Sequence, residues 1–234
     1  MTGIAPENKL IAVPEGKVIL HKTFNAVFYG WDNEFGQHHA DVPAFEASQY
    51  LVSNQEFLGF VEDNGYSTDC YWTVEGLAWL KFSQAAHPCF WRKTPLGWSL
   101  RLMLEEIPMP WDWPVEVNYL EAKAFCNWKA QKTGQSIRLP IEDEWYRLYD
   151  VAGLDADLPS PEHANIELKY ATSPCPVNHF QQGDFFDIQG NVWQWTETPI
   201  YPFDDFQVHP IYDDFSTPTF DGQHNLIKGG SWIS

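Results

Sequence analysis

The sequence is short of basic residues. Only 14 Lys and Arg stand against 32 Asp and Glu, which gives the 234-residue chain a formal net charge of −18. A chain this acidic repels the phosphates of nucleic acids and of anionic membranes, so we expect neither as a partner. Acidic side chains also supply the oxygen ligands that calcium prefers, although most of them simply face solvent.

Long apolar segments are also missing. No stretch is long and apolar enough to cross a bilayer, and residues 1–6 lack the basic and apolar parts of a secretory leader. None of the four cysteines belongs to a CxxC pair; they are Cys70, Cys89, Cys126 and Cys175. We therefore expect a cytoplasmic protein whose cysteines are buried thiols rather than disulfides.

Histidine pairs with metal-binding spacing are absent. No two histidines have the HxxxH spacing that places both imidazoles on one face of a helix. The eight are His21, His38, His39, His87, His163, His179, His209 and His224. A non-haem iron site needs converging His, or His with a carboxylate. We therefore expect these histidines to lie on the surface or in the core, not around iron.

Aromatic residues and helix signals are plentiful. Aromatics make up 16% of the chain, with 12 Trp, which suits a core with many turns or a pocket. Helices are predicted after Ser53 and after Asn118, each with Glu three residues on, and they end at Gly65 and Gly134. A third helix is predicted over residues 141–153.

The strand signals are shorter and more scattered. Strands are predicted at Lys17-Val18-Ile19-Leu20 and over residues 41–47, where Pro43 favours a sheet edge. Residues 66–113 read as a long, partly irregular insertion, and short strands and loops follow Pro159. No repeat or linker interrupts this order, so the sequence predicts one α+β domain over residues 1–234.

Two motifs near the end of the chain organise the rest. The first runs from Gly190 to Glu197, and the second is Lys228-Gly229-Gly230-Ser231-Trp232. Alternation predicts that Trp193 and Trp195 share one face of an extended segment, with Gln194 on the other. The simpler interpretation is a Trp-rich core hairpin, and the more specific one is a family signature.

The order of motifs resembles the sulfatase-modifying-factor family, the formylglycine-generating-enzyme domain. The family motifs are Arg138–Trp145, His163–Ile166, Asp187–Thr196 and Lys228–Trp232. Further stretches resemble the corresponding domain of ovothiol-type 5-histidylcysteine sulfoxide synthases: Gly30–Gly36, Met109–Asn118 and His209–Phe215. The resemblance covers about residues 10 to 234, and several spaced motifs in the right order are a specific signal.

The resemblance implies a C-type-lectin-like fold, with two or three helices, irregular antiparallel sheets and much loop. It implies a substrate-pocket domain of a non-haem-iron enzyme that joins cysteine sulfur to the histidine ring, with cysteine and histidine as substrates. The iron(II) would be held by a separate DinB-type domain, in cis or in trans, so we expect this chain to be inactive alone. The domain is also expected to lack its last strands.

The same resemblance points to individual residues. Tyr212 is the catalytic candidate, because a phenol can give a proton or an electron, although it can also merely pack. Asn165 with the Ile166 carbonyl corresponds to part of one calcium site, and Asn191 with position 194 corresponds to another. Gln194 stands where the family has Glu, which weakens calcium binding, since affinity depends on ligand charge.

Two other functions remain open at this point. A non-enzymatic lectin-like module that binds a ligand is the alternative, because fold does not fix function. Formylglycine generation is the third and is disfavoured. That activity needs a Cys where this chain has Ser234, and a hydroxyl cannot replace a thiolate as a ligand for a soft metal.

Overall fold

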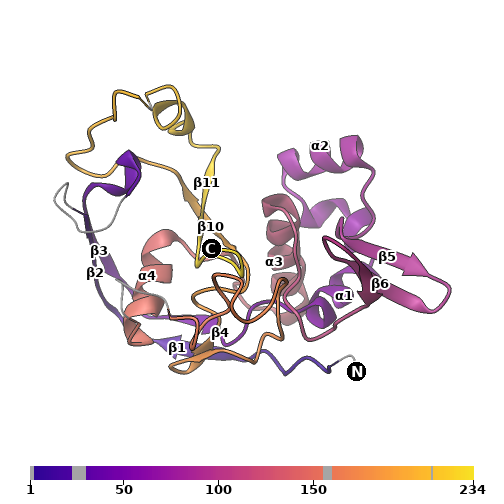
Figure 1. The fold of residues 1–234 in the computed structure, drawn as a ribbon. Helices are drawn as coiled ribbons and strands as arrows, with labels where there is room; N and C mark the ends of the chain where they lie inside the picture. The colour runs from indigo at the N-terminus through magenta and orange to yellow at the C-terminus, as the bar shows by residue number, and fades with distance from the viewer. Residues whose placement is uncertain (1–2, 23–29, 155–159, 212) are drawn as a thin grey trace.

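The computed structural model describes residues 3–22, 30–154, 160–211 and 213–234. These residues form four α-helices and a set of small antiparallel sheets (Figure 1). The α+β class is therefore confirmed. The helices are α1 (Asn54–Glu62), α2 (Val74–Ser83), α3 (Tyr119–Thr133) and α4 (Glu142–Val151).

The strands pair mostly in twos. The pairs are β1 (Leu10–Val13) with β4 (Phe45–Ser48), β2 (Gly16–Lys22) with β3 (Gly36–Val42), β8 (Gln181–Gln182) with β9 (Phe185–Phe186), and β10 (Gln194–Pro199) with β11 (Asn225–Lys228). A three-stranded sheet consists of β5 (Trp91–Thr94), β6 (Gly97–Arg101) and β7 (Glu106–Pro108). All these pairings are antiparallel.

Figure 1 shows two groups of elements. Helices α1, α2 and α3 lie with β5 and β6 on one side, and α4 lies with β1–β4 on the other. Strands β10 and β11 run between them, and the long loop that joins these two strands reaches towards β2 and β3 (Figure 1). The two C-terminal motifs, which lie along these strands, are thus at the centre of the molecule.

The first group is built around an aromatic core. Phe57 and Phe60 of α1 pack against Phe125 and Trp128 of α3, with ring centroids 5.2 to 6.3 Å apart. Offset and edge-on contacts of this kind add to the free energy gained from burying the rings. The core fixes α1 against α3, from which the rest of the group extends.

The second group has a smaller core under α4. Trp145 and Tyr149 face inward from this helix and pack against Val13, Phe185 and Ile188. Three acidic residues lie in the first turn of α4, where they complement the positive end of the helix. The four-residue spacing of Trp145 and Tyr149 places both rings on the same face of the helix.

The predicted starts of α1 and α3 and the predicted end of α3 are confirmed, whereas α1 ends at Glu62, before the predicted stop at Gly65. The Ser53 hydroxyl accepts a hydrogen bond from the Glu56 amide, and Asn118 and Glu121 form a complete capping box. Gly134 ends α3 in the left-handed conformation, at φ +71°. The predicted strand at Lys17–Leu20 lies within β2.

Three expectations were wrong in detail. Residues 66–113, predicted as a long and partly irregular insertion, contain α2 and the β5–β7 sheet, so the described residues form four helices rather than two or three. The apolar residues of α2 do not gather on one face, since Val74 and Phe82 are exposed, so the helical period was hidden. Residues 41–47 form the end of β3 and the start of β4, with Pro43 between them.

The four cysteines are all free thiols. Cys126 on α3 and Cys175 in the loop before β8 are buried, but Cys70 and Cys89 are exposed, so the expectation that the cysteines are buried was wrong for these two. Burial raises the pKa of both buried thiols to about 12. None of the described helices has the length and apolar character needed to cross a bilayer.

Candidate functional site

The two C-terminal motifs lie directly against each other. The Gly190 amide donates to the Gly229 carbonyl at 2.7 Å, and the Trp232 amide donates to the Asn191 carbonyl at 3.1 Å. Gly190 adopts φ +82°, and a Cβ there would lie 2.8 Å from the Asn165 carbonyl oxygen. Only glycine allows this approach, which explains the Gly-Asn pair of the first motif.

Asn191 ties this region together from a fully buried position. Its Oδ1 accepts from the Cys175 amide at 2.9 Å. Its Nδ2 donates to the Cys175 carbonyl at 3.2 Å and to Asp187 Oδ2 at 3.0 Å. Asn191 has φ +65°, a left-handed conformation that asparagine tolerates better than most residues. The side chain is therefore a structural crosslink, with its oxygen already engaged.

The other predicted calcium ligands offer few free oxygens. Asn165 Nδ2 donates to the Ser173 carbonyl at 3.0 Å, and Asn165 Oδ1 is buried without a partner. The Ile166 carbonyl accepts from the Lys169 amide at 3.0 Å. Gln194 directs its amide nitrogen, not an oxygen, at the backbone carbonyls of Asp187 and Ile188. The donor set therefore does not fit calcium, which needs six to eight oxygens.

Asp187 is the buried carboxyl of this region. It is fully inaccessible to solvent, and its Oδ1 has no hydrogen-bond partner. Burial raises the pKa of Asp187 to about 8, although the hydrogen bond from Asn191 acts in the opposite direction. Burial therefore favours the neutral, protonated form of this carboxyl. No sequence signal distinguishes Asp187, because it falls inside a motif whose Gly, Asn and Trp residues dominate.

Trp193 departs from the predicted pattern. It is 49% exposed and lies before β10, whereas Trp195 is half-buried on that strand. The left-handed turn at Asn191 delays the start of the strand to Gln194, so alternation does not extend back to Trp193. Trp193 is therefore a surface aromatic, and the prediction of a core position for it was wrong.

Tyr212 lies outside the described residues, but the residues on either side of it do not. Asp32 Oδ2 accepts a hydrogen bond from the His209 amide at 2.9 Å, and Asp32 Oδ1 accepts one from the Ser216 hydroxyl. In the sequence, Asp32 precedes His209 by 177 positions and Ser216 by 184 positions. One carboxylate therefore holds the loop at two points that flank Tyr212.

Two segments of the resemblance meet at this Asp32 clamp. Asp32 belongs to Gly30–Gly36, and His209 begins His209–Phe215. The rings of Trp31 and Phe215 also lie 6.0 Å apart, and Gln37 and Asp204 exchange two backbone hydrogen bonds of 3.1 Å. Burial alone would raise the pKa of Asp32, but the hydrogen bonds from Ser216 and His209 lower it below its usual value. Asp32 is therefore held as a carboxylate.

Polar contacts at the start of α4 tie this helix to β11 and to β3. Lys228, in the second motif, pairs with Glu142 at the start of α4, and its Nζ also lies 3.3 Å from the Tyr146 hydroxyl. His38 of β3 contacts Asp143 at 2.8 Å. The sequence identified both motifs but not these pairings, which depend on long-range packing.

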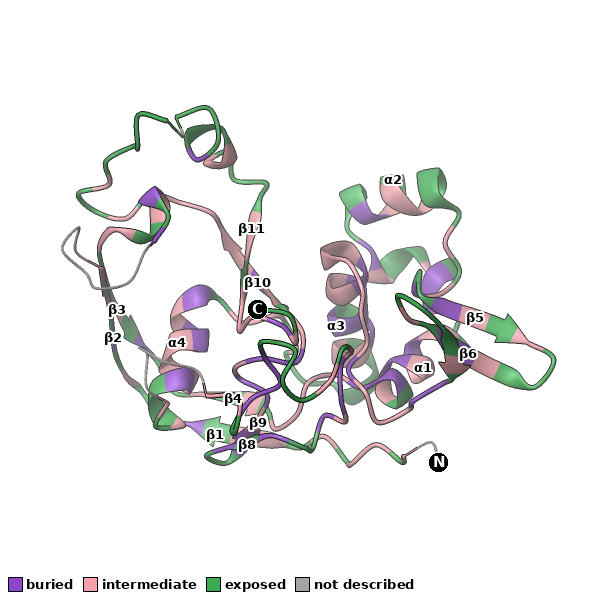
Figure 2. Ribbon diagram, in the orientation of Figure 1, coloured by how far each residue is buried: buried purple, intermediate pink, exposed green. Residues whose placement is uncertain are grey.

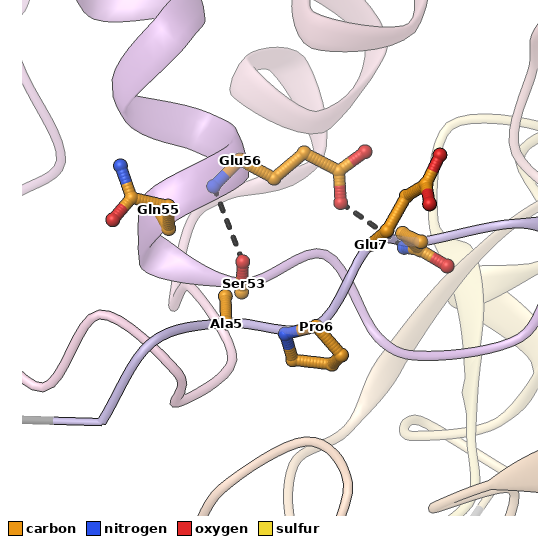
Figure 3. A pocket seen from close by; sticks show the side chains of 7 residues that line it. Ala5, Pro6, Glu7, Ser53, Gln55 and Glu56 are labelled. Carbon is orange, nitrogen blue, oxygen red and sulfur yellow. Dashed lines mark hydrogen bonds between the residues drawn. The ribbon is translucent and has the colours of Figure 1, made fainter.

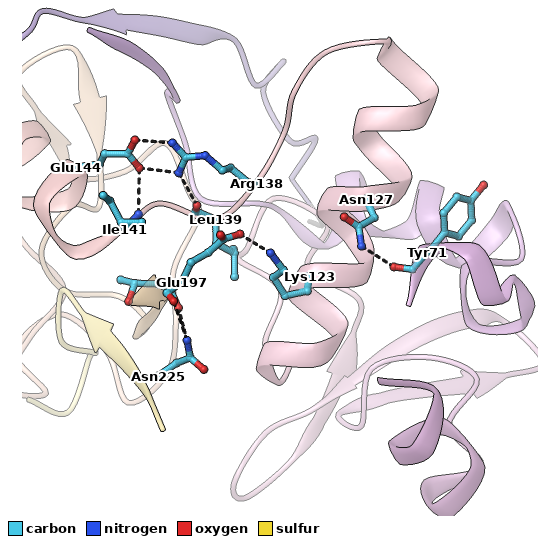
Figure 4. A network of polar contacts seen from close by, with 10 residues as sticks. Tyr71, Lys123, Asn127, Arg138, Leu139, Ile141, Glu144, Glu197 and Asn225 are labelled. Carbon is cyan, nitrogen blue, oxygen red and sulfur yellow. Dashed lines mark hydrogen bonds and ion pairs between the residues drawn. The ribbon is translucent and has the colours of Figure 1, made fainter. Parts of the chain in front are cut away.

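Figure 4 shows a second set of contacts between helices and strands. Arg138 holds Glu144 with two hydrogen bonds of 2.7 and 2.5 Å. Lys123 of α3 pairs with Glu197 of β10, whose carbonyl accepts from Asn225 Nδ2 at 3.2 Å. Bidentate Arg–carboxylate geometry is specific as well as strong. These contacts orient the first motif relative to α3 and α4.

A pocket lies between the N-terminal segment and the start of α1 (Figure 3). Three of its polar residues are already partnered: Glu56 accepts from Asn8 at 3.0 Å and pairs with Lys129, and Ser53 caps the helix. The lining residues are Ala5, Pro6, Glu7, Asn8, Ser53, Gln55 and Glu56. They include no nucleophile with a neighbouring base, so the pocket has no recognisable chemistry.

No iron site is found within the described ranges of the chain. Among those residues, no three His, Cys, Asp or Glu side chains are placed to hold one metal ion. The residues present thus do not fit a non-haem iron site, which needs converging imidazoles or imidazoles with a carboxylate.

Comparison with known proteins agrees with the arrangement of the motifs. Residues 3–234 match the family described as "Sulfatase-modifying factor enzyme 1-like domain". A hercynine oxygenase of Mycolicibacterium smegmatis is 32% identical over 95% of this chain and 54% of its own length. A hercynine oxygenase of Mycobacterium tuberculosis is 31% identical over 86% of this chain and 48% of its own length. The chain therefore spans about half the length of these relatives.

Solved structures support the fold. The Treponema denticola variable protein 1 aligns over 100% of this chain and 87% of its own, with a TM-score of 0.63 and 16% identity. PvdO of Pseudomonas aeruginosa aligns over 95% of this chain and 82% of its own, with a TM-score of 0.56 and 18% identity. Since residues 3–234 match one family without interruption, the chain belongs to the sulfatase-modifying factor family.

Proposed function

We propose that this chain is the substrate-pocket domain of a sulfoxide synthase, which joins the sulfur of cysteine to the imidazole ring of histidine. The observation that carries the proposal is the family match over residues 3–234, together with relatives at 31% and 32% identity named hercynine oxygenase. A more distant relative in Schizosaccharomyces pombe, 25% identical over 92% of this chain and 25% of its own length, is named ergothioneine biosynthesis protein 1.

The chain's own contribution is binding and positioning. The Asp32 clamp fixes the loop on both sides of Tyr212, and we assign to Tyr212 the donation of a proton or hydrogen bond to the reacting groups. Iron(II), when bound by a separate DinB-type domain, would activate dioxygen. The described residues of this chain do not fit the metal, so their part is to hold and orient the substrates.

The names of the relatives favour a second imidazole substrate. Hercynine carries a trimethylated amine where histidine carries an ammonium group. The ammonium donates hydrogen bonds, whereas the trimethylated group has no N–H to donate and is usually recognised by aromatic faces. A pocket for histidine would therefore offer polar contacts to the amino nitrogen, whereas a pocket for hercynine would offer aromatic contacts to it.

The test is a coupling assay with mass detection of the sulfoxide. The chain is incubated with cysteine, iron(II) and oxygen, with histidine or hercynine, and with or without a DinB-type iron-binding domain. We expect product only with that domain present, and a rate at least about tenfold lower for Tyr212→Phe. Tyr170→Phe, at an exposed tyrosine, is the matched control. Product from the isolated chain would contradict the proposal.

A ligand-binding module without catalysis is the second candidate. It is favoured by the inactive Cα-formylglycine-generating enzyme 2 of Mus musculus, a relative 23% identical over 99% of this chain and 76% of its own length. A thermal-shift screen distinguishes the two functions. Stabilisation by histidine, hercynine or cysteine supports the synthase domain, and stabilisation only by sugars or peptides supports the binding module. Formylglycine generation remains disfavoured because of Ser234.

A further inference from the structure

The Gln194 side chain spans a turn of the first motif. Its Nε2 donates to the Asp187 carbonyl at 2.9 Å and to the Ile188 carbonyl at 3.0 Å. Its Oε1 accepts from the Trp145 indole nitrogen at 3.3 Å. Carbonyl oxygens only accept and an indole N–H only donates, so these partners allow one orientation of the carboxamide.

A carboxylate at this position would meet the wrong partners. Glu at 194 would place a charged oxygen, with no proton, about 3 Å from two carbonyl oxygens. Three oxygens around one point repel each other unless a cation lies between them. Calcium satisfies this arrangement, since it binds carboxylate and backbone carbonyl oxygens together. The family resemblance places Glu and calcium there.

The surroundings of Gln194 leave little room for an added ion. Gly229 adopts φ +89°, and a Cβ at this position would lie 2.5 Å from Gln194 Nε2 and 2.8 Å from the Ile188 carbonyl oxygen. The second motif is therefore packed directly on the amide nitrogen. The nitrogen and a cation cannot both occupy the space in front of these carbonyls.

We propose that the Gln194 carboxamide takes the place of a calcium ion in this chain. Its N–H groups neutralise the Asp187 and Ile188 carbonyl dipoles that a cation would otherwise neutralise. The turn between β9 and β10 therefore folds without calcium, and Gln194→Glu converts the turn into a calcium-dependent one. This inference does not depend on the catalytic role of the domain.

The test compares thermal unfolding in EDTA and in millimolar calcium. We expect the unaltered chain to have the same Tm in both. Gln194→Glu is expected to lose on the order of 10 °C in EDTA, because it buries an unpaired charge beside two carbonyls, and to recover most of this in calcium. Calcium titration by calorimetry on both chains gives a readout that does not require unfolding.

Two control variants separate charge from lost hydrogen bonding. Gln194→Met removes the hydrogen bonds without adding charge and should lower the Tm equally in EDTA and calcium. Gln135→Glu adds the same charge at an exposed position and should change neither. A lower Tm of the unaltered chain in EDTA would overturn the proposal. So would a Gln194→Glu chain whose stability ignores calcium, or which stays unfolded with it.

Discussion

The aromatic side of this molecule, around α1 and α3, and its polar side, around the two C-terminal motifs, are stabilised by different kinds of contact. Around α1 and α3, the core is a cluster of stacked and edge-on aromatic rings, joined at its edge by a hydrogen bond from the Tyr66 hydroxyl to the buried Glu121 carboxyl. Around the two C-terminal motifs, the core contains buried Asn165, Asp187, Asn191 and Thr196, held by hydrogen bonds of fixed direction. Apolar packing tolerates changes of shape that conserve volume, whereas a polar network fails when one member is removed.

The loop between β10 and β11 also differs from the interior in its exposure to solvent. Figure 2 shows that the interior of both sides is buried, but much of the loop between β10 and β11 is exposed or partly exposed. That loop carries the catalytic candidate and depends on a few contacts, chiefly with Asp32. Binding residues often lie on loops positioned by a rigid scaffold, and here the polar side is that scaffold.

The largest expected effect is in the aromatic core. Phe60 is fully buried, so Phe60→Ala should lower the free energy of unfolding by about 4 kcal/mol, through lost burial and the cavity left behind. Phe82→Ala, at a 90% exposed ring on α2, should have almost no effect. Urea unfolding measures both. Equal losses would show that the aromatic cluster does not dominate its side.

A slightly smaller loss is expected at the buried ion pair. Lys228→Met leaves Glu142 buried without its cation, which should cost about 3 kcal/mol. Adding Glu142→Gln to Lys228→Met should restore part of that loss, because no unpaired charge remains. A double-mutant cycle in urea gives the coupling free energy. A double variant less stable than Lys228→Met would contradict this view of the pair.

The hydrogen-bond crosslink should come third. Asn191→Ala leaves the buried Cys175 amide without its partner and puts Ala at a positive φ, at a total cost of about 2.5 kcal/mol. Asn127→Ala removes one exposed hydrogen bond, to the Tyr71 carbonyl, and should cost far less (Figure 4). If the two variants lose equal stability, the contrast between the sides does not hold.

The smallest effect on global stability is expected at Asp32. Asp32→Asn should free the loop locally, so that limited proteolysis within residues 204–216 becomes about tenfold faster while the unfolding midpoint hardly moves. Asp213→Asn, an exposed neighbour in the same loop, is the control. Unchanged cleavage of the Asp32 variant would mean that the clamp does not hold the loop.

The clamp should also depend on pH. Because the folded pKa of Asp32 lies below that of the unfolded chain, its carboxylate contributes stability above the unfolded value. That contribution is lost as the pH falls through the folded pKa. Loop cleavage in the unaltered chain should therefore accelerate in acid, and cleavage of Asp32→Asn should change less over the same range.

Local signals in the sequence predicted local structure well. The caps at Ser53 and Asn118 and the stop at Gly134 depend on residues within one turn, and all three are confirmed. Helix α2 was missed because Val74 and Phe82 blur its apolar face. Periodicity is informative only where one face is buried.

The same local signals did not predict contacts between distant segments of the chain. Gly30–Gly36 and His209–Phe215 were both singled out, yet nothing in their composition indicated that Asp32 would bind Ser216 across 184 positions. The calcium residues were identified by position, but the direction of the Gln194 amide depends on where the Asp187 and Ile188 carbonyls point. Such geometry results from the packing of distant segments and cannot be predicted from any single one of them.

The placement of the cysteines gives the protein two internal reporters of unfolding. Cys126 follows Phe125 of the aromatic core, and Cys175 bonds through its backbone to Asn191. Once exposed Cys70 and Cys89 have been alkylated, each remaining thiol reacts only when its own surroundings open. Mass spectrometry of the labelled peptides can therefore measure separately how fast the aromatic core around Cys126 and the polar network around Cys175 open. The chain needs no engineered probe for this measurement.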